Sequence, residues 1–120
     1  MKNRWEYVDL KVRQKSMDLV DQIYIITKKF PKEEMFWLTS QLRRAGTSIP
    51  LNIGEWNSRK TDKDFARFLS IAHGSCVEVE VAIRISYRQW YIQGDAQEDL
   101  LQKTQEIKRM LWWLSNSLSV

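Results

Sequence analysis

The chain has 120 residues, of which 43% are hydrophobic, 12% aromatic and 28% charged, and this composition excludes a disordered or low-complexity protein. Its single cysteine excludes a disulfide framework within the chain and a zinc site built from several cysteines. The net charge of +4 reflects an excess of basic residues in the first half, which is compatible with a polyanionic partner and equally with an ordinary solvated surface.

No segment of the sequence predicts secretion or insertion into a membrane. Residues 1–10 mix basic and acidic side chains and are followed by no apolar stretch, so they do not resemble a signal peptide. The longest uncharged apolar run, residues 110–114, is far shorter than the about 20 residues that a transmembrane helix needs. We therefore expect a cytoplasmic protein with a single domain over residues 1–120.

The first half of the chain predicts two helices, because apolar or small residues recur at steps of three and four. Pro31 ends the first helix, since proline lacks a backbone donor and restricts the residue before it. The second helix contains Pro50, which we expect to kink it. The two core stripes are Val12, Ser16, Leu19, Ile23, Ile26 and Phe30, and then Leu38, Leu42, Ala45, Ile49, Ile53 and Trp56.

The second half predicts two more helices. Thr61 or Asp62 is a suitable N-cap for a third helix of roughly 28 residues, and the pair Gly94-Asp95 separates it from a fourth. Because the linkers are short, we expect an all-α, antiparallel up-down four-helix bundle. The stripes are Phe65, Leu69, Ala72, Cys76, Val79, Ile83, Ser86 and Trp90, and then Leu100, Thr104, Ile107, Leu111, Leu114 and Leu118.

Several apolar residues fall outside these stripes. At about 100° per residue, Ile71, Val81 and Ile85 lie opposite the core stripe of the third helix, and Trp112 and Trp113 lie well away from that of the fourth. A helix that is apolar on two faces is central in a larger protein or contacts another subunit, and a chain of this size has no central position. We therefore predict an oligomer. The alternative is a broad core stripe with a few tolerated apolar residues on the surface.

The sequence offers little for catalysis. The single histidine, His73, lacks the Glu-x-x-His pattern of a metal site in a bundle, since position 70 is Ser70. Cys76 lies one turn from His73 but on the core stripe, and the alternative to a reactive pair is a buried cysteine beside a hydrogen-bonded histidine. The glycines are isolated and form no phosphate-binding loop. We predict no enzymatic activity, no metal, no cofactor and no small-molecule substrate.

Six basic residues are candidates for contact with nucleic acid. They lie on the second helix and around its connection to the third, whose N-terminus could add backbone donors for phosphates. The alternative is pairing within the chain, with Glu55, Asp62 or Asp64 as partners. The six residues are Arg43, Arg44, Arg59, Lys60, Lys63 and Arg67.

Three blocks of sequence match a known pattern. They are Leu-Thr-Ser-Gln-Leu-Arg-Arg-Ala at 38–45, Ser-Ile-Pro-x-Asn-Ile at 48–53, and Asp-Phe-x-Arg-Phe-Leu-Ser-Ile-Ala-x-Gly-Ser at 64–75. Together with a looser match at 14–19, they make the chain similar over nearly its whole length to the bacterial four-helix-bundle proteins encoded in intervening sequences of 23S ribosomal RNA genes.

The resemblance implies a cytoplasmic homopentameric ring of four-helix bundles without a catalytic site. The accessory variability proteins of diversity-generating retroelements are relatives, and in that branch the resemblance implies binding of nucleic acid and of a reverse transcriptase. For the ribosomal branch it implies an architecture more firmly than a function.

Several positions depart from the family's pattern. Trp37, Trp56 and Trp90 stand where the family usually has glycine, and Leu51 and Val81 replace smaller or polar residues. Tryptophan is enriched at interface hot spots and costs solubility when exposed. One hypothesis is that these changes, evolved or engineered, create a surface for a second protein, as in a subunit of a larger symmetric assembly. The alternative is that natural variants fill the ends of the bundle's own core.

Two functions follow as predictions. The first is a non-catalytic pentameric scaffold that acts through protein–protein association, and the second is a nucleic-acid-binding accessory protein whose six basic residues contact phosphates. In the first, Val81 and Ile85 make contacts between subunits. The further surface for a second protein consists of Leu51, Trp56, Trp90, Trp112 and Trp113.

Overall fold

The computed structural model describes residues 4–55 and 61–118 of the chain. Within these ranges the protein is all-α, with four α-helices and no β-strand, as the periodicity predicted. None of the helices described there is long and apolar enough to cross a membrane. The helices are α1 (Arg4–Thr27), α2 (Ser40–Glu55), α3 (Asp62–Arg88) and α4 (Gly94–Asn116), and a 3-10 helix, η1 (Lys32–Glu34), and a π-helix, η2 (Met35–Thr39), precede α2.

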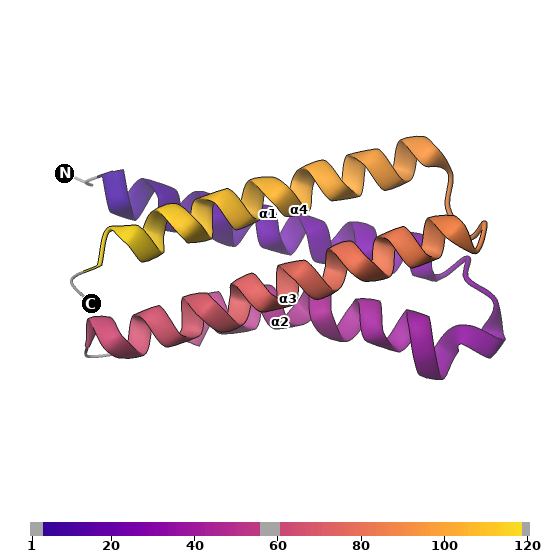
Figure 1. The fold of residues 1–120 in the computed structure, drawn as a ribbon, viewed down its shortest axis with the longest axis horizontal. Helices are drawn as coiled ribbons and strands as arrows, with labels where there is room; N and C mark the ends of the chain where they lie inside the picture. Colours follow the sequence, from indigo (N-terminus) through magenta and orange to yellow (C-terminus); the bar gives the residue numbers. More distant parts are fainter. Residues whose placement is uncertain (1–3, 56–60, 119–120) are drawn as a thin grey trace.

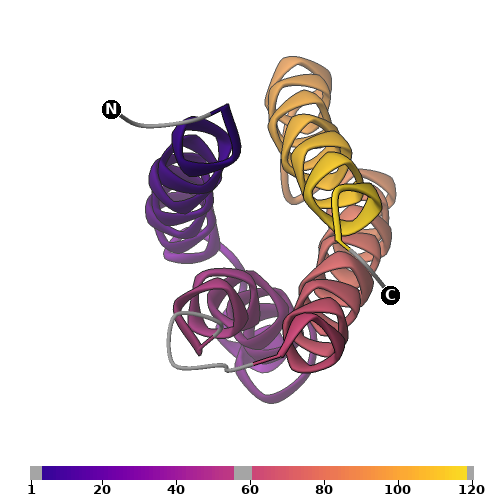
Figure 2. The same ribbon diagram turned by 90° about the vertical axis from the view of Figure 1, so that its left-hand side faces the viewer.

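The helices lie along the long axis of a molecule that measures 46 × 25 × 20 Å. The start of α1 and the end of α4 lie at one end, whereas η2 and the connection between α3 and α4 lie at the other (Figure 1). Viewed along the axis, α1 lies diagonally across from α3, and α2 diagonally across from α4 (Figure 2). This diagonal placement keeps the outward faces of α1 and α3 apart.

The four predicted stripes face one shared core. Every stripe residue that the structure describes is buried or half-buried, with the exception of Trp90. The polar members are satisfied within their own helices, because the hydroxyls of Ser16, Ser86 and Thr104 donate to backbone carbonyls one turn earlier, at 2.7–2.9 Å. A stripe of mixed apolar and hydroxyl residues can therefore be buried without unpaired polar groups.

One ion pair links α3 to α4 inside the molecule. Lys108 Nζ donates to Glu80 Oε1 at 2.8 Å, and the Glu80 side chain is buried. Because a carboxylate without its counter-charge is costly to bury, this pair ties the two helices in one register.

The helix ends differ from the predictions in two places. Thr61 is the N-cap of α3, as predicted, and its hydroxyl accepts a hydrogen bond of 3.1 Å from the Asp64 amide. However, α1 ends at Thr27, before Pro31, and its last residues form a turn. Gly94, expected in the break between the third and fourth helices, is the first residue of α4, so the connection lies one turn earlier.

Candidate functional site

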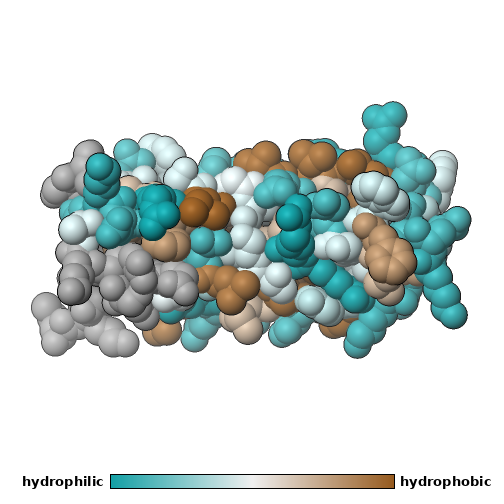
Figure 3. Space-filling model, turned by 90° about the horizontal axis from the view of Figure 1, so that it is seen from below, coloured by the Kyte–Doolittle hydropathy of each residue, from teal (hydrophilic) through white to brown (hydrophobic). Residues whose placement is uncertain are grey.

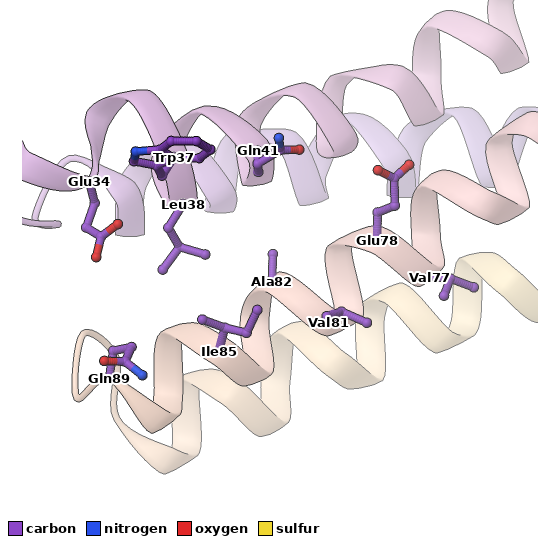
Figure 4. Close-up of a pocket in the computed structure, with 10 residues that line it drawn as sticks. All are labelled: Glu34, Trp37, Leu38, Gln41, Val77, Glu78, Val81, Ala82, Ile85 and Gln89. Carbon is purple, nitrogen blue, oxygen red and sulfur yellow. The ribbon is translucent and has the colours of Figure 1, made fainter.

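An apolar groove lies between the start of α2 and the second half of α3. Val77, Val81 and Ile85 follow at four-residue steps, so they form one ridge on the outward face of α3. The opposite wall comes from η2 and the first turn of α2 and includes Trp37 and Leu38 (Figure 4). The groove has a volume of about 570 Å³. It can receive apolar side chains from another molecule, in the manner of a groove that binds a helix.

The charged residues that line this groove are both acidic. Glu34 lies toward one end and Glu78 toward the other (Figure 4). The Glu34 carboxylate accepts a hydrogen bond of 2.7 Å from the Tyr91 hydroxyl, which joins η1 to the connection between α3 and α4. This hydrogen bond, with added contributions from desolvation and the negative charges nearby, raises the pKa of Tyr91. The groove is therefore suited to a ligand that is apolar along its length and positive at its ends.

Three of the most exposed aromatic side chains in the described part of the chain belong to segments at one end of the molecule. Phe36 is 87% exposed, Trp37 73% and Trp90 92%, and both η2 and the α3–α4 connection lie at this end (Figure 1). We call these three residues the aromatic end. Their exposure contradicts the alternative in which Trp37 and Trp90 fill the ends of the core.

Trp90 has an unusual backbone conformation. Its φ is 68°, and among the described residues it alone has a positive φ without being glycine. The Tyr91 amide donates to the Ser86 carbonyl at 2.9 Å and the Trp90 amide to the Tyr87 carbonyl at 3.0 Å, which are the two hydrogen bonds of a Schellman motif. Its left-handed position is usually glycine. The prediction that Trp90 continues the core stripe is wrong, because this turn ends α3 and directs the indole into solvent.

Exposed apolar residues also occur on the face that includes α2 and α3, where separate hydrophobic patches interrupt a mostly hydrophilic surface (Figure 3). Of the predicted interface residues, Val81 and Ile85 line the groove, while Leu51 is exposed on α2 and Trp112 on α4. Trp113 is half-buried against the core, contrary to the expected outward position, because an indole at the flank of the stripe is long enough to reach back to it. The role of these residues in binding a second protein stays a prediction.

The predicted phosphate-binding residues form no single patch in the part of the chain that the structure describes. Arg43 and Arg44 lie near the start of α2, whereas Lys63 and Arg67 lie in the first two turns of α3, toward the opposite end of the molecule (Figure 1). From Arg43 to the end of α2 the helix rises about 18 Å. The predicted residues Trp56, Arg59 and Lys60 lie outside the described ranges.

The α2 arginines are held against their own chain. Arg43 Nε donates to the Thr27 hydroxyl at 2.9 Å, and its guanidinium lies over the Tyr24 ring at 4.6 Å. Arg44 donates to the side-chain oxygen of Gln41 at 3.0 Å. Arg43 therefore helps to pack α2 against α1, whereas the contact of Arg44 lies on the exposed surface of α2.

The histidine and cysteine considered for catalysis differ in their exposure to solvent. His73 is exposed and Cys76 is buried. Burial raises the pKa of Cys76 from 9.0 to about 12, with the Glu80 carboxylate adding to the rise and Lys108 opposing it. A thiol with this pKa stays protonated at neutral pH and is a poor nucleophile. Across residues 4–55 and 61–118, no group of three or more His, Cys, Asp or Glu residues is arranged to hold a metal ion.

Sequence reasoning missed Phe36 and the part of the groove wall that η2 forms. In a π-helix the hydrogen bonds run from i to i+5, so side chains leave the steps of three and four by which the stripe was counted. The available signal was composition, because Met35, Phe36 and Trp37 are three large apolar residues in succession, more than one core-facing stripe can bury.

The fold and the site together define a small all-α protein. In the described ranges, four α-helices share one hydrophobic core, and an apolar groove lies on their surface. The family model described as 23S rRNA-intervening sequence protein matches residues 8–112, and the chain belongs to this family. A solved structure from Bacteroides thetaiotaomicron, a protein with unknown function from the S23 ribosomal protein family, is similar, with a TM-score of 0.84 and 28% identity over 91% of this chain and 98% of that chain. A search of curated proteins gives no match. The resemblance to this family noted from the sequence blocks is confirmed.

Proposed function

We propose that the protein is a non-catalytic helical scaffold that acts by associating with copies of itself. In this proposal each chain is an antiparallel up-down four-helix bundle, and five chains form a ring. The number five rests on the resemblance to the family.

The apolar groove is the observation that carries the proposal. The core of the chain is closed without Val77, Val81 and Ile85, which remain exposed on one ridge of α3. Burying apolar surface gains about 25 cal/mol per Å². An aliphatic ridge beside a groove is also the geometry by which helices pack on one another. Burying this ridge against an apolar surface of another protein molecule is therefore favourable.

The absence of catalysis is part of the proposal. It is supported by the exposed His73, by the raised pKa of the buried Cys76 thiol, and by the commitment of the Glu80 carboxylate to Lys108.

The native mass of the purified protein tests the proposal. Light scattering on a sizing column should give five times the 14.4 kDa of one chain, about 72 kDa. A mass of 14.4 kDa at micromolar concentration would refute self-association. A stable oligomer with another number of chains would refute the ring of five and keep the scaffold.

Nucleic-acid binding is the second candidate, and salt separates the two. Binding through phosphates weakens steeply as salt rises, whereas association through apolar surface holds or strengthens. Lys63 and Arg67 are the described candidates on α3, so charge reversal at both should abolish retention of RNA or DNA if this candidate is correct. Unchanged retention would exclude these two residues as phosphate contacts.

A further inference from the structure

A second unpartnered apolar surface runs along α1. Exposed large apolar residues occur on α1 at positions 7, 10, 17, 24 and 25. The first four follow a spacing of three and four residues whose intervening positions hold Gln14 and Asp21. This is the three-and-four spacing of a helix that packs along another helix. It lies on the side of α1 opposite the buried Val12 and Leu19. The stripe, called here the α1 stripe, consists of Tyr7, Leu10, Met17 and Tyr24.

We propose that the α1 stripe of one copy docks into the groove between α2 and α3 of a second copy. The inference rests on the proposed self-association and specifies its two contact surfaces. Within one chain the two surfaces cannot cover each other, because α1 lies diagonally across from α3 (Figure 2). Every copy thus presents both halves of one contact, and a head-to-tail contact of this kind forms a ring when the rotation between successive copies closes.

The stripe is longer than the groove, so only part of it docks. From Tyr7 to Tyr24 the stripe rises about 26 Å along α1, and from Val77 to Gln89 the groove follows α3 for about 18 Å. The first three stripe residues span about 15 Å, so they fit within the groove at once, at spacings of three and seven residues. Leu10 and Met17 are then anchors in the groove.

The charges of the two surfaces are also complementary. Lys11 lies within the docked segment, with its Nζ 5.8 Å from the centre of the Tyr7 ring. The groove carries Glu34 toward one end and Glu78 toward the other (Figure 4). A positive charge on the docked helix and negative charges in the groove favour this pairing. The two aspartates of the outward face, Asp18 and Asp21, follow Met17 and lie beyond the docked segment.

Two single variants and their mixture test the proposal. Met17→Glu places a charge in the stripe and Val81→Glu places one in the groove, and both positions are exposed in the single chain, so the helical circular dichroism should not change. Each variant alone should lose the native mass and run at 14.4 kDa. Mixed in equal amounts, the two should form a 1:1 dimer of twice that mass, about 29 kDa, because the intact groove of one receives the intact stripe of the other.

The matched control is Trp112→Glu, a charge at an exposed apolar residue on α4 outside both surfaces, and it should keep the native mass. Retention of the native mass by either Met17→Glu or Val81→Glu would overturn the pairing, and so would a mixture that stays monomeric. These failures differ from failure of the proposed function, in which the unmodified protein is itself a monomer.

Discussion

Replacing Trp90 should change the stability of the protein through the backbone. The residue follows α3 with a φ of 68°, a conformation in which a Cβ approaches the following carbonyl oxygen. The side chain is 92% exposed, so it contributes no burial within the chain to offset this cost. Glycine at position 90 should therefore relieve strain without opening a cavity.

The size of the effect follows from two opposing contributions. A residue with a Cβ costs about 1–2 kcal/mol in the left-handed region. Glycine loses more backbone entropy on folding, which costs roughly 0.5–1 kcal/mol. Trp90→Gly should therefore have a free energy of unfolding about 1 kcal/mol greater than that of Trp90→Ala, or a Tm about 4 °C higher for a chain of this length.

The comparison between these two variants isolates the backbone. Both remove the indole, so any contact that Trp90 makes in an assembly is lost equally from each. Urea unfolding followed by circular dichroism, at one protein concentration for all variants, gives the difference directly. Trp90→Asn should fall between the two, because asparagine tolerates the left-handed region better than alanine. An alanine variant as stable as the glycine variant would refute the argument from positive φ.

Three further predictions concern the interior and the helix ends. Lys108→Met should lower the free energy of unfolding by about 3 kcal/mol, because it leaves the buried Glu80 carboxylate without its counter-charge. The control Lys103→Met removes one partner of an exposed pair and should lower it by less than about 1 kcal/mol. Urea unfolding at pH 7 measures both changes. The protein should lose stability as pH rises from 9.0 toward 12, because the Cys76 thiol releases its proton at a lower pH in the unfolded chain than in the folded one. Cys76→Ala should lose less stability over the same pH range. An equal loss in the two proteins would contradict the raised pKa of Cys76. Thr61→Ala should cost about 1 kcal/mol by removing the cap of α3, and Thr61→Ser should be nearly neutral in the same assay.

The interior of this protein could be predicted because helical periodicity is local. Positions such as Leu19, Ile49 and Ile107 repeat at three and four residues and face the core whatever the neighbouring helices do. Two of the errors fall where the hydrogen-bond pattern changes. Trp90 leaves its stripe at a Schellman turn, where the spacing of the sequence continues but the backbone changes direction, and Gly94 begins a helix that it was expected to precede.

The surface was harder to predict because it depends on the relative placement of helices. Val81 and Ile85 could be placed outside the core from their angle on one helix. The groove beside them needs a second wall, and that wall comes from a π-helix whose side chains are out of phase with the stripe that follows. On α1, the polar Gln14 and Asp21 dilute the apolar stripe, so composition alone did not distinguish it from an ordinary solvated face.

The groove and the aromatic end are parts of one continuous surface, because Trp37 belongs to both. Trp90 belongs to that end, exposed and held at positive φ, so it costs stability in the backbone and gains no burial within the chain. Strain of this kind persists where surrounding structure or a bound partner compensates for it. A helix docked along the groove and extending past Trp37 would bury the aromatic end as well, and the indole of Trp90 would then gain the contact area that the single chain does not provide.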